Sequence, residues 1–152
     1  MKVRDAMSKD VATVRSGLSV KELASRMDRQ GIGYFPVADQ GRLVGVVTDR
    51  DVTCRLVADG RDPVRTKVRD IMSKGVAYCF DDDALPAAVQ LMEQNRIRRI
   101  PVLDCKKHLV GILSLTDVAR AAPGRLTAEL LDAVLREAPL SVTIDPTAQI
   151  LT

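Results

Sequence analysis

Two short segments of the chain each place a hydroxyl residue three positions before an aspartate, directly after an apolar run. The first segment carries Thr48 and Asp51, and the second carries Ser114 and Asp117. An ionised carboxylate has two acceptor oxygens, which suit two adjacent hydroxyl groups. Hydroxyls and free N–H groups at the start of a helix suit an anion. The same spacing is typical of a helix capping box, so a purely structural role is the alternative.

Charged residues beside these segments are candidates for contact with an anion. Asp49-Arg50 separates the hydroxyl from the aspartate in the first segment, whereas the uncharged Leu115-Thr116 does so in the second. Arg50 therefore favours ligand contact more strongly in the first segment. Arg98 and Arg99 are further candidates, and because neighbouring strand residues point to opposite faces, we expect at most one of them to enter a cleft easily. A solvated charge on an edge strand explains either arginine equally well.

The elements that position these residues follow from the hydrophobic pattern. Residues 43–47 form a short apolar run that predicts a buried strand, and residues 48–59 predict a helix that ends at Gly60. Upstream, residues 20–30 carry apolar side chains on one helical face, and Gly31 follows at the usual stop position. With extended segments at 11–14 and 32–38, the expected order is β-α-β-β-α.

This pattern occurs twice, which indicates a duplication. Val3–Lys9 returns as Val68–Lys74, 65 residues later, and Pro36-Val37 returns as Pro101-Val102 at the same offset. We expect repeats at 1–60 and 68–122, a polar linker at 61–67, and a helix and tail at 123–152. Because about 60 residues bury a core only marginally, the two repeats should pack together around a pseudo-two-fold axis. The fold class is α/β (α+β).

The end of the chain is expected to add a further helix at 126–137, with leucines and a valine on one side. The helix could dock on its own chain or join two copies. A strand at 141–144 is possible in the tail, and a partly loose tail is the alternative.

Composition narrows the class of protein. The chain has 152 residues, 46% hydrophobic and 3% aromatic, so its core must be mainly aliphatic. A net charge of +3 does not call for nucleic acid. No run approaches the roughly 20 apolar residues of a membrane span. Three widely spaced cysteines argue against a disulfide framework and favour a reducing cytoplasm.

The repeated motifs resemble a tandem pair of cystathionine-β-synthase (CBS) domains. The carrying features are Met7-Ser8 and Met72-Ser73, the two Pro-Val pairs, and the Gly-x-x-Thr/Ser-x-x-Asp segments that begin at Gly45 and Gly111. The resemblance implies a regulatory module that binds an adenosine-containing ligand between its halves: AMP, ADP or ATP, with S-adenosylmethionine or a dinucleotide such as NAD as less favoured ligands. It also implies that two modules pair into a flat homodimer.

The resemblance assigns roles to particular residues. Asp51 and Asp117 would accept hydrogen bonds from the ribose, and Thr48 and Ser114 would contact phosphate. The family often also contacts phosphate through an arginine, for which Arg98 and Arg99 are the candidates. The base would contact the extended segments of each half. The full set of implied ligand-binding residues is Val11, Thr13, Ile32, Gly33, Tyr34, Phe35, Pro36, Thr48, Arg50, Asp51, Arg98, Arg99, Ile100, Pro101, Ser114, Thr116 and Asp117.

Other features have plainer explanations. Tyr34 and Phe35 are adjacent, so one of them faces inward, and burial statistics favour a core role over base stacking for each. His108 lies near Cys105, but a metal site needs about four ligands and no second pair stands nearby. Asp81-Asp82-Asp83 is explained by negative charge ahead of a helix rather than by Mg²⁺. No cysteine or serine has the sequence context of a catalytic nucleophile.

Three functions are therefore compared. The favoured one is a cytoplasmic regulatory sensor of adenine nucleotides that acts through an unidentified protein partner or its own dimer. The alternative is a structural dimerisation module that binds no ligand. An enzyme acting on nucleotides is disfavoured because metal ligands do not cluster and only one histidine is available for acid–base chemistry. Membrane and nucleic-acid partners are not expected.

Overall fold

The computed structural model describes residues 1–136, and the strand considered at 141–144 lies outside them. The first repeat contains α1 (Val3–Ala6), α2 (Val20–Gln30), β1 (Tyr34–Asp39), β2 (Arg42–Thr48), α3 (Asp49–Val52) and its π-helical continuation η1 (Thr53–Val57). The second contains α4 (Val68–Ile71), β3 (Cys79–Phe80), α5 (Leu85–Asn95), β4 (Arg99–Leu103), β5 (Leu109–Ser114) and α6 (Leu115–Ala121), followed by α7 (Arg125–Leu135).

Helix α2 begins and ends where the sequence predicts, and α5 is its counterpart in the second repeat. Ser19 caps α2 by accepting a hydrogen bond from the backbone N–H of Glu22, and Gly31 ends the helix in the left-handed conformation, with φ of 63°. The apolar face of α2 buries Val20 and Leu23 completely. The matching helix α5 buries four apolar residues and tolerates a proline in its first turn.

Each repeat contributes one antiparallel hairpin, and the two hairpins have the same register. Tyr34 pairs with Thr48 in the first, and Arg99 pairs with Ser114 in the second. The expected first strand is much reduced: Val14 makes a single bridge to Val37, and only β3 forms a short parallel strand beside β4. The mixed α/β class with two repeats is confirmed, with small open sheets rather than full five-element units.

The first helix of each repeat packs into the core of the other half. Val3 of α1 is fully buried among the second repeat's residues, and Ser8 exchanges two backbone hydrogen bonds with Ile112. In the same way, Val68 and Ile71 of α4 are fully buried in the first repeat's core. The cores therefore do not follow the sequence boundaries at 1–60 and 68–122.

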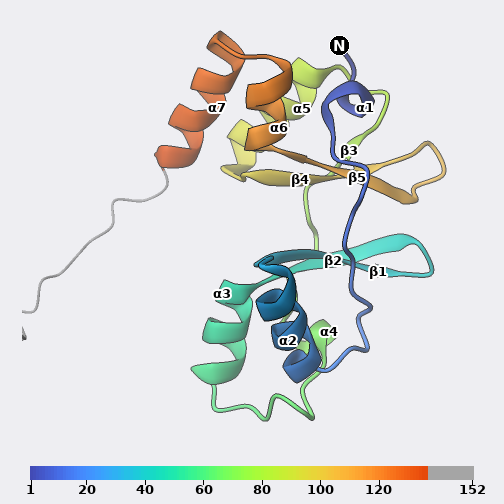
Figure 1. The fold of residues 1–152 in the computed structure, drawn as a ribbon, viewed down its shortest axis with the longest axis vertical. Coiled ribbons are helices and arrows are strands. Elements are labelled where there is room, and N and C mark those ends of the chain that lie inside the picture. The colour runs from blue at the N-terminus through green and yellow to red at the C-terminus, as the bar shows by residue number, and fades with distance from the viewer. Residues whose placement is uncertain (137–152) are drawn as a thin grey trace, which may run out of the picture.

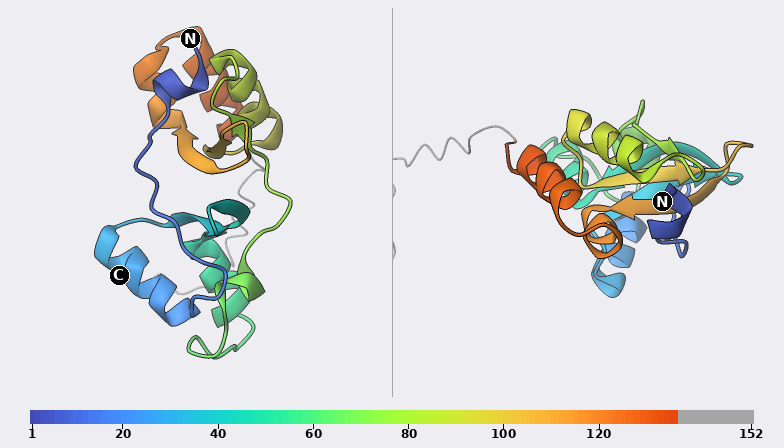
Figure 2. Two further views of the ribbon diagram at one scale, coloured as in Figure 1. Left: turned by 90° about the vertical axis from the view of Figure 1, so that its right-hand side faces the viewer. Right: turned by 90° about the horizontal axis from the view of Figure 1, so that it is seen from above.

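The two hairpin sheets face each other across a seam, and the helices lie on the outer sides (Figure 1). Two segments without regular secondary structure, residues 9–13 and 74–78, connect the halves on opposite sides of the seam (Figure 2). Helix α7 packs on α5 and α6, and its Leu130 and Val134 are buried in the second core. Within residues 1–136, no helix has the length and apolar character needed to cross a bilayer.

Candidate functional site

Both hydroxyl–aspartate pairs form complete capping boxes. The Thr48 hydroxyl accepts a hydrogen bond from the N–H of Asp51 at 3.2 Å, and Asp51 Oδ2 accepts one from the N–H of Thr48 at 2.9 Å. Ser114 and Asp117 repeat this arrangement at 3.1 and 2.8 Å. The structural role is thus present in both copies, and it engages only one oxygen of each carboxylate through the backbone.

The second carboxylate oxygen distinguishes the two copies. Asp117 Oδ1 accepts a hydrogen bond from the hydroxyl of Ser8 at 3.1 Å. Asp51 Oδ1 instead faces Arg55, whose Nη1 lies 3.7 Å away and also donates to the carbonyl of Ile71 at 2.9 Å. Ala121 stands at the position equivalent to Arg55 in the second copy, so no guanidinium competes for Asp117 there.

Asp117 lies in a cavity of about 240 Å³ that draws residues from both repeats. We call it the carboxylate cleft. Its wall combines the extended N-terminal segment, the start of β1, the start of β4 and the end of β5. The lining residues are Ser8, Asp10, Ala12, Ile32, Tyr34, Arg99, Ile112, Ser114 and Asp117.

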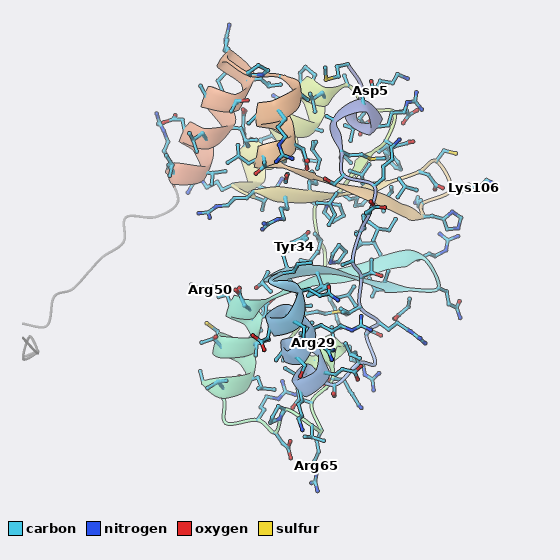
Figure 3. The ribbon with its side chains drawn as sticks, in the orientation of Figure 1. Asp5, Arg29, Tyr34, Arg50, Arg65 and Lys106 are labelled. Carbon is cyan, nitrogen blue, oxygen red and sulfur yellow. The ribbon has the colours of Figure 1, made fainter. Side chains whose placement is uncertain are left out.

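A second cavity of about 450 Å³, which we call the arginine cleft, adjoins the carboxylate cleft. It contains four arginines and one carboxylate, and it shares Tyr34 and Arg99 with its neighbour. Figure 3 shows Tyr34 between the two sheets and Arg50 at one edge of the seam. The lining residues are Gly33, Tyr34, Val46, Thr48, Asp49, Arg50, Arg96, Ile97, Arg98 and Arg99.

Tyr34 and Arg99 occupy equivalent positions in the two repeats and meet at the seam. Each is the first residue of its hairpin, and Arg99 lies 65 residues after Tyr34. The guanidinium carbon of Arg99 is 5.6 Å from the centre of the Tyr34 ring, which is within range for a cation–π interaction. Phe35, by contrast, is fully buried in the first core, so of the two adjacent aromatics only Tyr34 borders the clefts.

Tyr34 should remain mostly protonated at about pH 11. Burial raises the pKa of Tyr34 to about 12, and the positive charge of Arg99 opposes this shift. Because the folded-state pKa exceeds the ordinary value of 10.0, the associated stability is present below pH 10.0 and is lost as the pH rises towards about 12. Ultraviolet titration of phenolate should show a further rise in Arg99→Ala and loss of the high-pH step in Tyr34→Phe. A lower Tyr34 pKa in Arg99→Ala would contradict the contact.

Several residues predicted to touch the ligand lie elsewhere. Phe35 and Ile100 are fully buried in the two cores, and Pro36 and Pro101, the next residues of β1 and β4, are also buried, so none of the four lines either cleft. Val11 and Thr13 line a separate cavity of about 280 Å³ near the hairpin turns, since alternation along the extended segment turns Asp10 and Ala12 to the carboxylate cleft instead. Thr116 is exposed on α6, outside both clefts.

Two expectations about charge are corrected. Arg98 and Arg99 both line the arginine cleft, although strand alternation predicted that only one would enter. The reason is that β4 begins at Arg99, so Arg98 precedes the strand and is not bound by its alternation. Asp51 does not line the arginine cleft, whereas Thr48 and Arg50 from the same segment do.

Eight residues that line the two clefts are outside the predicted ligand-binding set, and three of them show why. Ser8 belongs to the repeated Met-Ser motif, which was a usable signal because it recurs as Ser73. Asp10 and Arg96 carried no such signal, as each has a glycine at the equivalent position of the other repeat, Gly75 and Gly31. Among residues 1–136, no group of three or more His, Cys, Asp or Glu side chains is arranged to hold a metal.

Comparison with known proteins agrees with this architecture. The CBS domain matches residues 3–58 and 68–124, and the chain belongs to the CBS domain family. It is 42% identical over 117 residues to the CBS domain-containing protein YhcV of Bacillus subtilis (strain 168), covering 77% of this chain and 82% of that protein.

Two solved structures with bound nucleosides share the fold. CBSX2 in complex with AMP has a TM-score of 0.69 at 29% identity, covering 80% of this chain and 95% of that one. The CBS domain pair of MJ0100, in complex with 5′-methylthioadenosine and S-adenosyl-L-methionine, has a TM-score of 0.68 at 27% identity, covering 79% and 94%. Adenosine-containing ligands are thus bound by some structural neighbours of this chain.

Proposed function

We propose that the protein is a regulatory module that binds an adenine nucleotide of the AMP, ADP or ATP class at the seam between its repeats. The observation that carries this proposal is the carboxylate of Asp117. One of its oxygens is fixed by the capping box, and the other lies in a cleft that combines apolar residues with Arg99 and draws its walls from both repeats. The ligand-bound CBS pairs of CBSX2 and MJ0100 support the adenosine class.

Each part of the carboxylate cleft matches one part of a nucleotide. Asp117 Oδ1 would accept from a ribose hydroxyl in place of, or together with, the hydroxyl of Ser8. Ile32 and the ring of Tyr34 give a flat apolar wall suited to a base. Arg99 supplies a guanidinium for a single phosphate. Because these groups come from both halves, a bound nucleotide would add contacts that link the halves across the seam and so change how they are held together.

The signal would pass through that change in the seam, to a protein partner or through pairing of two modules into a homodimer. A regulatory role is proposed in preference to catalysis, because the clefts hold arginines and capping carboxylates but no nucleophile–base pair. A cytoplasmic location is proposed because all three cysteines, Cys54, Cys79 and Cys105, are free.

A thermal-shift screen of AMP, ADP, ATP, S-adenosylmethionine and NAD tests the proposal. At about 100 times its dissociation constant, a ligand adds about 2.7 kcal/mol of stability. For a chain of this size the melting midpoint should rise by roughly 5–10 °C. If none of the five moves the midpoint, the nucleotide sensor is rejected and the ligand-free dimerisation module is favoured.

Asp117→Asn should weaken binding of the active nucleotide by about 10- to 100-fold, because it removes a charged acceptor from the ribose site. Asp51→Asn is the matched control, since it makes the same change in the other capping box, where Arg55 already occupies the carboxylate. Isothermal titration calorimetry compares the two variants. Equal losses in both would contradict the placement of the ribose at Asp117.

A further inference from the structure

A groove of about 820 Å³ lies on the first repeat and shares no lining residue with the two clefts at the seam. We call it the outer groove. Its wall combines residues 13–18 with side chains from α2, the β1–β2 turn and α4. Helices α2 and α4 lie on the outer side of the first hairpin (Figure 1), so a molecule bound here would lie away from the seam.

Three arginines line the outer groove without forming an ion pair. Arg15, Arg26 and Arg69 come from three separate segments, and none of the ion pairs formed within residues 1–136 includes any of them. Arg26 donates a hydrogen bond to the carbonyl of Thr13 at 3.3 Å, which leaves most of its N–H donors available. The groove therefore presents donors of the kind that bind carboxylates.

Two carboxylates share the groove, but they do not saturate the arginines. Asp39 accepts hydrogen bonds from the hydroxyl and the backbone N–H of Ser16, at 2.6 and 3.0 Å, so both of its oxygens are engaged. These two bonds lower the pKa of Asp39, and the nearby charges of Arg15 and Arg69 lower it further. The other carboxylate belongs to the exposed Glu22, and one net positive charge remains.

The second repeat shows what fills the equivalent place. Arg4 is the counterpart of Arg69, and the backbone N–H of each donates at 2.9 Å to a carbonyl, that of Asp81 for Arg4 and that of Ser16 for Arg69. The carboxylate of Asp81 also lies 4.0 Å from the guanidinium of Arg4. Ser16 has no charge, and its hydroxyl is bonded to Asp39. The second repeat thus carries its own carboxylate where the first leaves an arginine open.

The fold does not need the other two arginines either. Phe80 and Leu91 occupy the positions of Arg15 and Arg26 in the second repeat. Because apolar side chains serve at both positions of the same architecture, neither charge is required to build the repeat. A groove that gathers three cations in one repeat, where the other has one arginine paired with an aspartate, is best explained by an anionic group from outside the chain.

We propose that the outer groove docks an acidic segment of a partner protein, whose adjacent carboxylates bind Arg15, Arg26 and Arg69 as Asp81 pairs with Arg4. A carboxylate is favoured over other anions because the built-in counterpart is an aspartate. A groove of about 820 Å³ has room for several side chains, which favours a run of Asp or Glu over an isolated acid. The inference does not depend on nucleotide binding, since the groove lies outside both clefts.

Fluorescence anisotropy of a labelled hexa-aspartate peptide tests the proposal with the full chain at low ionic strength, where exposed charges are least screened. Arg69→Gln should weaken peptide binding by about 10-fold, the loss of one charge-assisted contact. Arg4→Gln is the matched control, because it removes the same charge from the other repeat, where Asp81 already pairs with it. Equal losses in the two variants, or no binding of the peptide to the wild type, would overturn the proposal.

Gly17→Asp tests the groove by giving it a carboxylate of its own. A Cβ at Gly17 would meet only Arg69 Nη1, at 3.7 Å, so the new side chain can be accommodated beside that guanidinium. The equivalent residue of the second repeat is already an aspartate, Asp82. Gly17→Asp should weaken hexa-aspartate binding by at least about 10-fold without lowering the melting midpoint. Gly17→Asn, of the same size but without charge, should bind like the wild type, and equal affinities in the two variants would overturn the site.

Two further arms identify the occupant. If inorganic phosphate displaces the labelled peptide at a lower concentration than unlabelled hexa-aspartate does, the groove is a site for a small free anion and the docking proposal is overturned. If Arg69→Gln converts a dimer into a monomer in sedimentation experiments, the occupant is a second copy of the chain and the partner proposal is overturned. The peptide titrations contain no nucleotide, so a failure of the proposed sensor would leave their result unaffected.

Discussion

A fragment of residues 1–60 should fail to fold cooperatively, whereas a fragment of residues 9–74 should fold. The first fragment ends before Val68 and Ile71, which are fully buried in the first core, and it retains Val3, which belongs to the second core. Losing two fully buried aliphatic side chains removes about 3–6 kcal/mol. That loss is comparable with the whole stability of a domain of about 60 residues.

Circular dichroism during heating compares the two fragments. A cooperative transition is expected for 9–74, and a gradual change without a transition is expected for 1–60. The control is Val68→Ala in the full chain, which should lower the melting midpoint because it cuts back the same buried side chain without altering the ends. Equal transitions in the two fragments would show that α4 is dispensable to the first core.

Gly45→Val should destabilise the full chain by about 3 kcal/mol, one of the largest effects of any single substitution outside the cores. A Cβ at Gly45 would lie 2.6 Å from the backbone oxygen of Ser73 and 2.9 Å from Met72 Sδ. Ser73 also exchanges two backbone hydrogen bonds with Val46, at 2.9 and 3.1 Å, so its backbone cannot withdraw without losing them. The first glycine of the motif is thus needed for the close crossing of the two halves.

The equivalent substitution Gly111→Val should cost less, about 1–2 kcal/mol. Its nearest contact is Met7 Sδ at 2.6 Å, which can rotate away, and the backbone oxygen of Ser8 is farther, at 3.0 Å. Gly17→Ala serves as the control, because its Cβ would meet only Arg69 Nη1 at 3.7 Å, and we expect a change within about 0.5 kcal/mol. Urea denaturation ranks the three variants. If Gly45→Val lowers the free energy of unfolding no more than Gly17→Ala does, the proposed need for a close crossing at Gly45 is contradicted.

Local sequence patterns predicted the elements well because they are determined locally. The capping boxes at Thr48 and Ser114, the stop at Gly31 and the apolar face of α2 all depend on residues within one or two turns. The expected helix at 126–137 is present at Arg125–Leu135 and docks on its own chain.

The exchange of α1 and α4 could not be predicted from the repeat itself. Both first helices have the same pattern, and the pattern would be satisfied equally if each packed in its own half. The choice depends on long-range contacts, such as the pairing of Ser8 with Ile112 and of Ser73 with Val46. Sequence periodicity does not encode contacts between segments so far apart.

The difference between the two aspartates was also hidden from the sequence. Arg50 favoured ligand contact in the first copy, but the sequence did not reveal the role of Arg55, one helical turn after Asp51, which reaches both Asp51 and the carbonyl of Ile71. The i,i+4 spacing of Asp51 and Arg55 was available, but its effect depends on where α4 lies. Arg96 was missed because it occupies a position where the sequence rules expect glycine.

The two connecting segments at 9–13 and 74–78 limit how the halves can move. Each has five residues and is anchored at one end by paired backbone hydrogen bonds, Ser8 to Ile112 and Ser73 to Val46. Five residues can span at most roughly 16–18 Å, so neither side of the seam can swing wide open. Because the two segments lie on opposite sides of the seam (Figure 2), we expect the halves to rotate against each other more readily than they separate. A ligand at the seam would then act by rotating one half relative to the other. A protein that detects this rotation should contact both halves at the edge of the seam.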